Sequence, residues 1–122
     1  MKKTLILFLL LFYACSNDDR TQDPVLCTEE ARPGIEVTVK DTEDNMFLVK
    51  DVTVVAVDNE YRETLKNVSG TNIFIGAYER TGNYTVVTNK TNYVQATSDL
   101  VIVTKDDCHV ITKSIEVFLN KK

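Results

Sequence analysis

Tryptophan is absent from the 122 residues, and His109 is the sole histidine of the sequence. Trp is the best ring for stacking against a sugar, so a glycan site would depend here on tyrosines such as Tyr61, Tyr78 and Tyr93. A single histidine also supplies too few soft ligands for a structural zinc site. The sequence therefore leaves weak glycan binding as an alternative function and gives no reason to expect a cofactor.

Groups for nucleophilic catalysis are equally scarce. Serines occur only at positions 16, 69, 98 and 114. On a regular final strand, His109 and Ser114 would face opposite sides of the sheet, so the imidazole could not activate the hydroxyl. A bulge near Lys113 would weaken this argument, but no third group is evident. We expect no catalytic residue and no enzymatic activity.

Positive charge is in deficit as well. The sequence has 14 Lys and Arg residues against 18 Asp and Glu residues, a formal net charge of −4, and no local basic cluster offsets it. Binding to the phosphates of nucleic acid needs such a cluster. We therefore expect no nucleic-acid partner.

The longest apolar run, Thr4 to Phe12, is too short to span a bilayer, which requires about 20 residues. It follows Lys2 and Lys3 and precedes Ala14 and Cys15, so residues 1–14 resemble a bacterial lipoprotein signal peptide cleaved before a lipid-modified cysteine. The resemblance implies anchoring to the outer membrane by a lipid on Cys15. An ordinary secretory signal is the alternative, and it would leave the exported chain soluble.

Residues 15–26 are predicted to form a polar tether, which has too few apolar residues to fold. Its first part, Ser16-Asn17-Asp18-Asp19, resembles the acidic export signals of Bacteroidetes surface lipoproteins. This resemblance implies display on the cell surface, with the periplasmic face as the alternative. Removal of the signal would lower the formal net charge from −4 to −6, because it takes away two lysines and no acid.

With Cys15 committed to lipid, Cys27 and Cys108 remain as an even pair in an oxidising compartment, which predicts a disulfide. Cys27 precedes the first predicted strand and Cys108 the last, so the bond would join the entry of the domain to its closing strand. A loop of about 80 residues closed in this way gains roughly 4 kcal/mol in the chain-entropy model. A reactive or metal-binding pair of thiols is the disfavoured alternative.

Between Gly34 and Lys122 the apolar residues alternate with a period of two, and no amphipathic helical stretch occurs. Turn residues such as Asp58-Asn59, Ser69-Gly70 and Thr81-Gly82-Asn83 separate the alternating segments. We predict one all-β domain, residues 27–122, built as a β-sandwich of about seven strands. The strands are expected around 35–40, 52–56, 61–65, 73–77, 84–88, 100–104 and 109–119.

Three segments in order resemble the carboxypeptidase regulatory-like family: Gly34 to Val39, Glu79 to Val86 and Cys108 to Thr112. The resemblance covers Cys27 to about Leu119 and implies a transthyretin-like (prealbumin-like, Ig-like) β-sandwich. That family opens a central strand with Gly-x-Tyr-x-Val, which matches Gly82 to Val86, and has a late tyrosine, which matches Tyr93. Asn92 and the Asp44-Asn45 turn depart from the family pattern and leave the subfamily open.

The same fold includes an enzyme branch, hydroxyisourate hydrolase, but the chain lacks its histidines and its Tyr-Arg-Gly-Ser ending. We expect Tyr84 to pack in the core with its hydroxyl capping a nearby backbone group, and Gly82 to serve a tight turn. An exposed ion pair between Glu79 and Arg80 would contribute only about 0–1 kcal/mol, so we expect these residues to form the shoulder of a hairpin rather than a site.

Acidic residues crowd two predicted loops. Asp41, Glu43 and Asp44 occupy one loop and Asp106-Asp107 the other, and oxygen ligands of this kind can bind calcium. The spacing matches no EF-hand loop, so we expect solvated turn acids and no other metal site. A weak calcium site at Asp41, Glu43 and Asp44 is the alternative.

A lipid-anchored sandwich without catalytic groups is most consistent with the docking of a partner protein through loops or an exposed sheet edge. The alternatives are weak glycan or ligand binding as an accessory of an envelope uptake system, and a purely structural role in the envelope. The sequence does not name the partner, because function depends on the site rather than on the fold.

Overall fold

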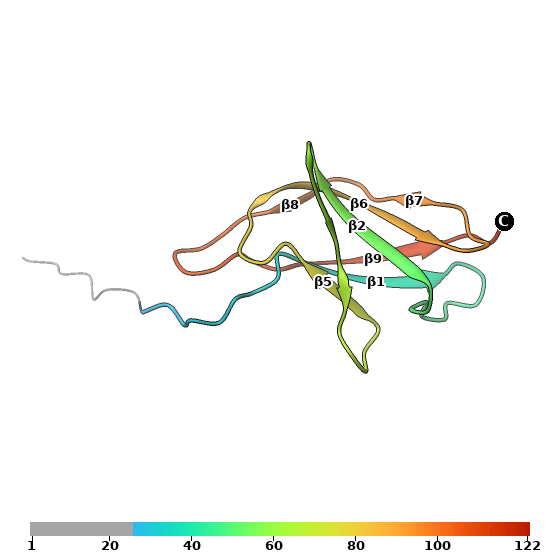
Figure 1. Cartoon of the computed structure of the whole chain (residues 1–122), viewed down its shortest axis with the longest axis horizontal. Coiled ribbons are helices and arrows are strands. Elements are labelled where there is room, and N and C mark those ends of the chain that lie inside the picture. The colour runs from blue at the N-terminus through green and yellow to red at the C-terminus, as the bar shows by residue number, and fades with distance from the viewer. Residues whose placement is uncertain (1–25) are drawn as a thin grey trace, which may run out of the picture.

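The computed structural model describes residues 26–122, all of them in strands, turns and loops (Figure 1). The predicted signal peptide, Cys15 and most of the predicted tether lie outside the described residues. Within residues 26–122 no helix is long and apolar enough to cross a membrane.

The prediction of an all-β domain is confirmed, but the count of about seven strands is wrong. The described residues form nine strands, because two short segments of two residues each also pair. The predicted polar strand ends at Thr64, and Lys66–Asn67 beyond it pairs in the other sheet. The last strand begins at Lys113 rather than at His109. The strands are β1 (Ile35–Asp41), β2 (Val52–Asp58), β3 (Tyr61–Thr64), β4 (Lys66–Asn67), β5 (Ile73–Gly76), β6 (Gly82–Lys90), β7 (Ala96–Thr97), β8 (Val101–Val103) and β9 (Lys113–Leu119).

Two sheets form the layers of a sandwich. The first has the order β4-β5-β1-β9, in which β1 and β9 run parallel and the other pairs are antiparallel. The second has the order β3-β2-β6-β7, and β8 also pairs with β6. β8 pairs with the start of β6 and β7 with its second half, so the edge beside β6 is interrupted between β7 and β8 (Figure 1). β4 and β9 are the two edge strands of the first sheet.

The alternation of residues along each strand explains which face becomes core. In β1 the side chains of Ile35, Val37 and Val39 are fully buried, while those of Glu36 and Thr38 point away from the core. Burial of one such aliphatic side chain contributes about 1.5–3 kcal/mol. The second sheet supplies the opposite wall with Val54, Ala56, Tyr84, Val86, Val101 and Val103.

Tyr84 is buried, and its hydroxyl donates to the carbonyl oxygen of Arg80 at 2.9 Å, which confirms the predicted backbone cap. The guanidinium of Arg80 donates to Asp58 Oδ2 at 3.1 Å and lies over the ring of Tyr61, 3.7 Å from its centroid.

The predicted tight turn at Gly82 is wrong, because the turn lies at Tyr78 and Glu79 and Gly82 is the first residue of β6. A Cβ at position 82 would lie 2.6 Å from Asp58 Oδ2, so a larger residue there would force the Asp58 side chain to move. Arg80 pairs with Asp58 rather than with its neighbour Glu79, which contacts His109 instead.

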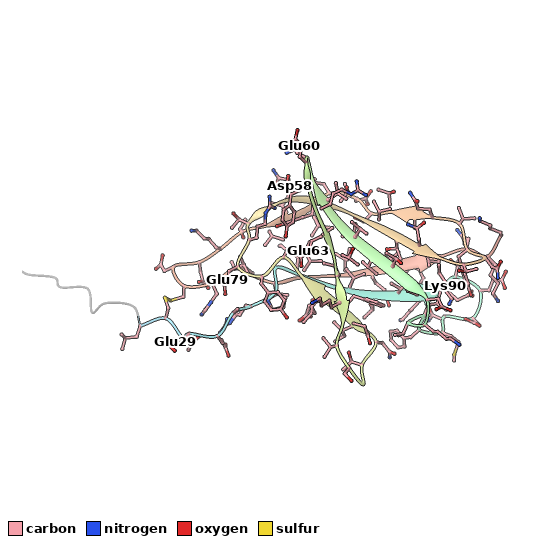
Figure 2. The ribbon with its side chains drawn as sticks, viewed as in Figure 1. Glu29, Asp58, Glu60, Glu63, Glu79 and Lys90 are labelled. Atoms are coloured by element: carbon pink, nitrogen blue, oxygen red, sulfur yellow. A yellow bond between two sulfur atoms is a disulfide. The ribbon has the colours of Figure 1, made fainter. Side chains whose placement is uncertain are left out.

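Parallel pairing of β1 and β9 gives the sandwich two distinct ends. The N-terminal end is made of residues 26–34, 77–81 and 104–112, from which β1, β6 and β9 start. The C-terminal end is made of residues 42–51, 91–95 and 120–122, which follow the far ends of β1, β6 and β9. Figure 2 shows Glu79 toward the first end and Lys90 at the second.

Candidate functional site

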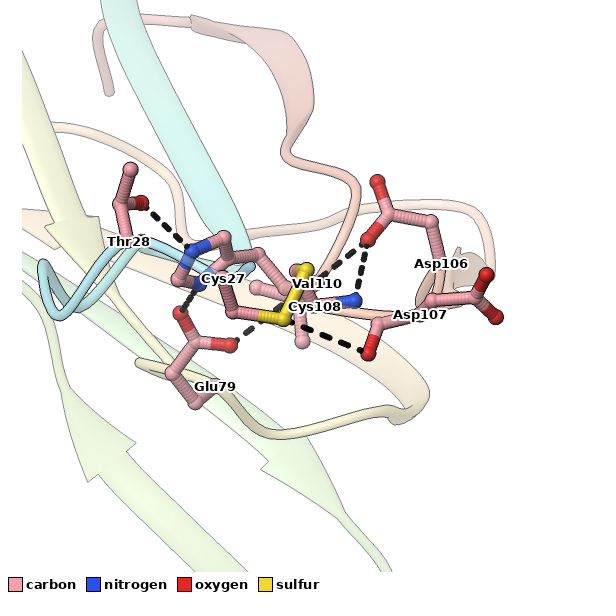
Figure 3. The surroundings of a disulfide bond; sticks show 8 residues. Cys27, Thr28, Glu79, Asp106, Asp107, Cys108 and Val110 are labelled. Atoms are coloured by element: carbon pink, nitrogen blue, oxygen red, sulfur yellow. Dashed lines mark hydrogen bonds and ion pairs between the residues drawn. A yellow bond between two sulfur atoms is a disulfide. The ribbon is translucent and has the colours of Figure 1, made fainter. Parts of the chain in front are cut away.

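The predicted disulfide is present at the N-terminal end. Cys27 and Cys108 are bonded, with their Cα atoms 5.1 Å apart and 81 positions between them in the sequence. The bond joins the segment that leads into β1 to the loop that leads into β9 (Figure 3). It therefore fixes the point at which the chain enters the sandwich.

Glu79 gathers the loops around this disulfide (Figure 3). Its Oε1 accepts from the backbone N–H of Arg32 at 2.9 Å and lies 2.6 Å from His109 Nδ1, and its Oε2 accepts from the N–H of Val110 at 3.2 Å. The N–H of Arg32, followed by the contact with His109, lowers the pKa of the Glu79 carboxyl. Glu79 has a left-handed backbone, φ 50°, which non-glycine residues adopt only where surrounding contacts hold them.

His109 is buried between Glu79 and the N-terminal segment. Thr28 Oγ1 lies 2.9 Å from His109 Nε2, so a hydroxyl, an imidazole and a carboxylate follow one another in the order of a nucleophilic triad. Thr28 was not expected as a partner of His109, because its position in the sequence carries no signal of this contact. Ser114, the serine considered for that role, instead donates to Glu36 Oε2 at 3.2 Å.

Carboxylates outnumber basic groups around this chain of groups, because Asp106 and Asp107 line the same hollow as Arg32. Asp106 Oδ1 accepts from the N–H groups of Cys108 and His109, which lowers the pKa of its carboxyl, and Asp107 and Glu30 lie in adjoining segments. Acyl transfer needs donors aimed at a developing negative charge, and carboxylates oppose such charge. We therefore infer that the contacts among Thr28, His109 and Glu79 hold the N-terminal segment in place rather than support catalysis.

Asp41 has a comparable position at the C-terminal end. Its side chain is buried, Oδ1 accepts from the N–H of Glu43 at 2.8 Å, and Oδ2 accepts from the Tyr93 hydroxyl at 2.6 Å. Lys121 Nζ lies 3.5 Å from Oδ2. The hydrogen bond from Tyr93 is the main reason that the pKa of Asp41 is lowered, and the same bond raises the pKa of Tyr93.

The expectation of a solvated turn acid is wrong for Asp41, which is the last residue of β1 and is buried. Both oxygens of Asp41 are bonded within the protein, and Asp44 Oδ1 accepts from the N–H of Met46 at 2.9 Å. Among residues 26–122, no three His, Cys, Asp or Glu side chains are grouped so that they could hold a metal ion. We do not propose a calcium site in this loop.

A basic hollow lies beside Asp41, at the same end. Its volume is about 480 Å³, and we call it the lysine hollow; it is lined by Asp51, Lys90, Thr91, Asn92, Tyr93, Lys121 and Lys122. The expectation that no local basic cluster exists is wrong here. The end of β6 brings Lys90 next to Lys121 and Lys122, 31 or more positions away in the sequence.

The outer edge of β9 is a second candidate surface. The N–H of Lys113 donates to Gly34, and the carbonyl of Leu119 accepts from Thr42, so the odd-numbered residues of β9 bond to β1. The alternation of a parallel ladder then turns the N–H and C=O groups of Ser114, Glu116 and Phe118 outward. No sequence pattern predicts this edge, because it depends on which strand lies beside β9.

The chain itself pairs with part of this edge and then leaves it. Asn120 accepts from the N–H of Val94, and Lys122 donates to the carbonyl of Asn92, in an antiparallel arrangement centred on Tyr93 and Lys121. The following residues turn away to form β7 and β8 on the other sheet. A groove of about 420 Å³ opens where they diverge, lined by residues 96–101 and 115–118. Leu100 and Phe118, 59 % and 46 % exposed, give it apolar walls.

The three tyrosines considered as sugar platforms differ in their surroundings. Tyr61 is covered by Arg80 and its hydroxyl donates to Glu63, which raises the pKa of Tyr61 to about 12. Tyr78 is half-exposed, on a shallow surface with Val68. Tyr93 lies in the lysine hollow. Tyr93 is therefore the tyrosine best placed to meet a charged ligand.

The sequence matches no protein-family model, and no curated protein is significantly similar to it.

Proposed function

We propose that this protein is an outer-membrane lipoprotein, anchored by a lipid on Cys15 and displayed at the cell surface, whose non-catalytic β-sandwich docks a partner protein. We further propose that the sandwich is of the transthyretin-like type found in carboxypeptidase regulatory-like domains. The outer edge of β9 is the single observation that carries the docking proposal. Ser114, Glu116 and Phe118 present backbone donors and acceptors that no other described strand pairs with.

The occupant we propose is an extended segment of the partner, added to β9 as a further strand. Free edges are templates for such pairing, in which backbone bonds give affinity and side-chain pockets give specificity. Asn92 to Val94 already bind the end of the same edge in this way. The partner segment would occupy the part of the edge that the chain leaves.

The side chains that line the groove indicate which residues the partner segment should contain. Leu100 and Phe118 offer contact to an apolar side chain, and the charged side chains that line the groove, Asp99 and Glu116, are both acidic. Glu116 is paired with Lys40 at 2.6 Å, whereas Asp99 is exposed. We propose that the segment carries an apolar residue for the groove and a lysine or arginine that faces Asp99.

The disulfide supports the anchoring part of the proposal. It ties Cys27 to Cys108, so a tether that begins at Cys15 would join the sandwich at its N-terminal end. The C-terminal end and the far part of β9 would then face away from the membrane.

A pair of proline variants tests the edge. Ser114→Pro removes an outward N–H and leaves the bonds between β9 and β1, whereas Ile115→Pro removes an N–H that faces β1. A photoreactive phenylalanine analogue at position 118, used in living cells, should cross-link one partner, and Ser114→Pro should abolish the product while the melting temperature is retained. Ile115→Pro should instead lower the melting temperature. The same analogue at Asn83, exposed on the other sheet, is the control.

Cross-links of equal yield from positions 83 and 118, or a product that persists in Ser114→Pro, would reject the edge as the docking site.

Protease treatment of intact cells that carry a C-terminal tag tests the location. Loss of the tag while a periplasmic marker survives would support surface display, and protection of the tag would reject it. A mass for the membrane-extracted protein without acyl chains on Cys15 would reject the anchor.

A further inference from the structure

The lysine hollow lies apart from the groove beside β9 and has a different chemistry. Three lysines and one aspartate line it, together with the exposed Thr91 and Asn92 and the partly buried Tyr93. Its volume of about 480 Å³ is within the range of ligand sites, about 300–1,000 Å³. We propose that the lysine hollow binds an acidic saccharide, a sugar chain that bears carboxylate or sulfate groups.

The ammonium groups of the hollow retain donors for a ligand. Lys90 Nζ donates to the carbonyl of Lys50 at 2.5 Å, which uses one of its three N–H groups. Lys121 Nζ lies 3.5 Å and 3.7 Å from Asp41 and Glu43, near the limit of an ion pair, and it is half-exposed. Lys122 makes no ion pair with any residue of the described chain. An anion in the hollow would therefore gain charge-assisted hydrogen bonds without displacing a strong internal pair.

Tyr93 is held in place rather than free to move. Its hydroxyl is bonded to the buried Asp41, its backbone is paired with Lys121, and Lys90 Nζ lies 6.0 Å from its ring centroid. A fixed ring that is partly exposed costs little entropy when a sugar ring stacks on it. Rigid elements position a site more accurately than mobile loops do.

The remaining lining groups favour a saccharide over an acidic peptide. Thr91, Asn92 and Asp51 together supply hydroxyl, amide and carboxylate groups, which can donate to and accept from sugar hydroxyls. A peptide would instead require apolar walls for its side chains, and the lining contains one aromatic and no aliphatic residue. The outer edge of β9, which we propose as the peptide-binding surface, is separate from the lysine hollow.

Isothermal titration with the full-length protein in detergent tests the proposal, using tetragalacturonic acid and a chondroitin sulfate tetrasaccharide as acidic probes. Maltotetraose is the uncharged probe, and tetraglutamate is the acidic peptide. At least one acidic saccharide should bind, with an affinity that falls as salt is added, while maltotetraose and tetraglutamate should bind at least tenfold more weakly. Preference for tetraglutamate, or no binding of either acidic saccharide, would overturn the proposal.

Matched lysine variants locate the site. Lys90→Gln/Lys122→Gln should weaken binding of the acidic saccharide by roughly tenfold or more, because each lysine supplies a charge-assisted bond. Lys66→Gln/Lys105→Gln removes the same charge from exposed positions outside the hollow and should leave binding unchanged. Equal weakening by both variants would show unspecific attraction and reject the site. Ser114→Pro should bind the saccharide as the parent does, so failure here would be separate from failure of the β9 edge.

Discussion

Each end of the sandwich is held together by one carboxylate that accepts hydrogen bonds from several segments, but the two ends differ in the groups around that carboxylate. At the N-terminal end Glu79 binds Arg32, His109 and Val110, and at the C-terminal end Asp41 binds Glu43, Tyr93 and Lys121. Each carboxylate gathers backbone or side-chain donors from segments that are distant in sequence. Such carboxylates compensate for short loops that carry few apolar contacts.

The ends differ in what surrounds these carboxylates. The segments of the N-terminal end contain five acidic and three basic residues, and a disulfide closes them covalently. The segments of the C-terminal end are balanced in charge, have no covalent link among the described residues, and leave lysines around an open hollow. This difference is consistent with our proposals that the first end lies next to the membrane anchor and that the second binds a ligand.

The largest effect we expect comes from breaking the covalent closure. Cys27→Ala/Cys108→Ala should lower the free energy of unfolding by about 4 kcal/mol, because the unfolded chain regains the entropy of a loop of about 80 residues. Urea denaturation of the variant and of the reduced parent measures it. A free energy unchanged in both would mean that the Glu79 contacts alone hold the N-terminal end, and would remove this difference between the two ends.

A smaller effect is expected at Tyr84. Tyr84→Phe keeps the buried ring but removes the hydroxyl that donates to Arg80 O and accepts from Arg80 Nη1, both at 2.9 Å. The loss should be about 1–2 kcal/mol, as for other buried hydrogen bonds. Tyr78→Phe, at a half-exposed position, is the control and should be close to neutral. Equal values for the two variants would contradict a stabilising role of the Tyr84 hydroxyl.

The smallest effects concern the single carboxylates and pH. The pKa values of Asp41, Glu79 and Asp106 are all lowered in the folded protein, so these groups bind protons more readily when unfolded. Their stabilisation is therefore complete above about pH 5 and is lost as pH falls through the unfolded pKa values, near 4, toward the folded ones.

Melting temperatures measured between pH 7 and pH 3 should show this decline. Glu79→Gln should reduce the fall of melting temperature with pH and increase hydrogen exchange at the Arg32 and Val110 amides. Asp41→Asn should also reduce this fall and should increase hydrogen exchange at the Glu43 amide. Faster exchange at both ends in either variant would show that the two ends are coupled, which the comparison does not predict.

Much of the fold follows from local sequence. The alternation in β1 and β6 identifies the buried side chains, and the Gly82-to-Val86 segment identifies the buried tyrosine with its backbone cap. The short pairings of β4 and β7 escape prediction because two residues carry no periodic signal. The start of β9 at Lys113 also escapes it, because the contacts of His109 with Glu79 and Thr28 hold that residue in the preceding loop.

By itself the sequence determined the all-β class and the buried faces, because each depends on a local period, and it predicted the pairing of Cys27 with Cys108 once Cys15 was set aside as the expected lipidation site. Tertiary structure alone decided the partners of Glu79 and Arg80, the lysine hollow and the outward groups of β9. These features join residues about 20 to 80 positions apart, or depend on which strand lies beside another. Local sequence patterns do not predict contacts between such distant residues, because the pairing of strands is fixed only when the two sheets pack on a shared core.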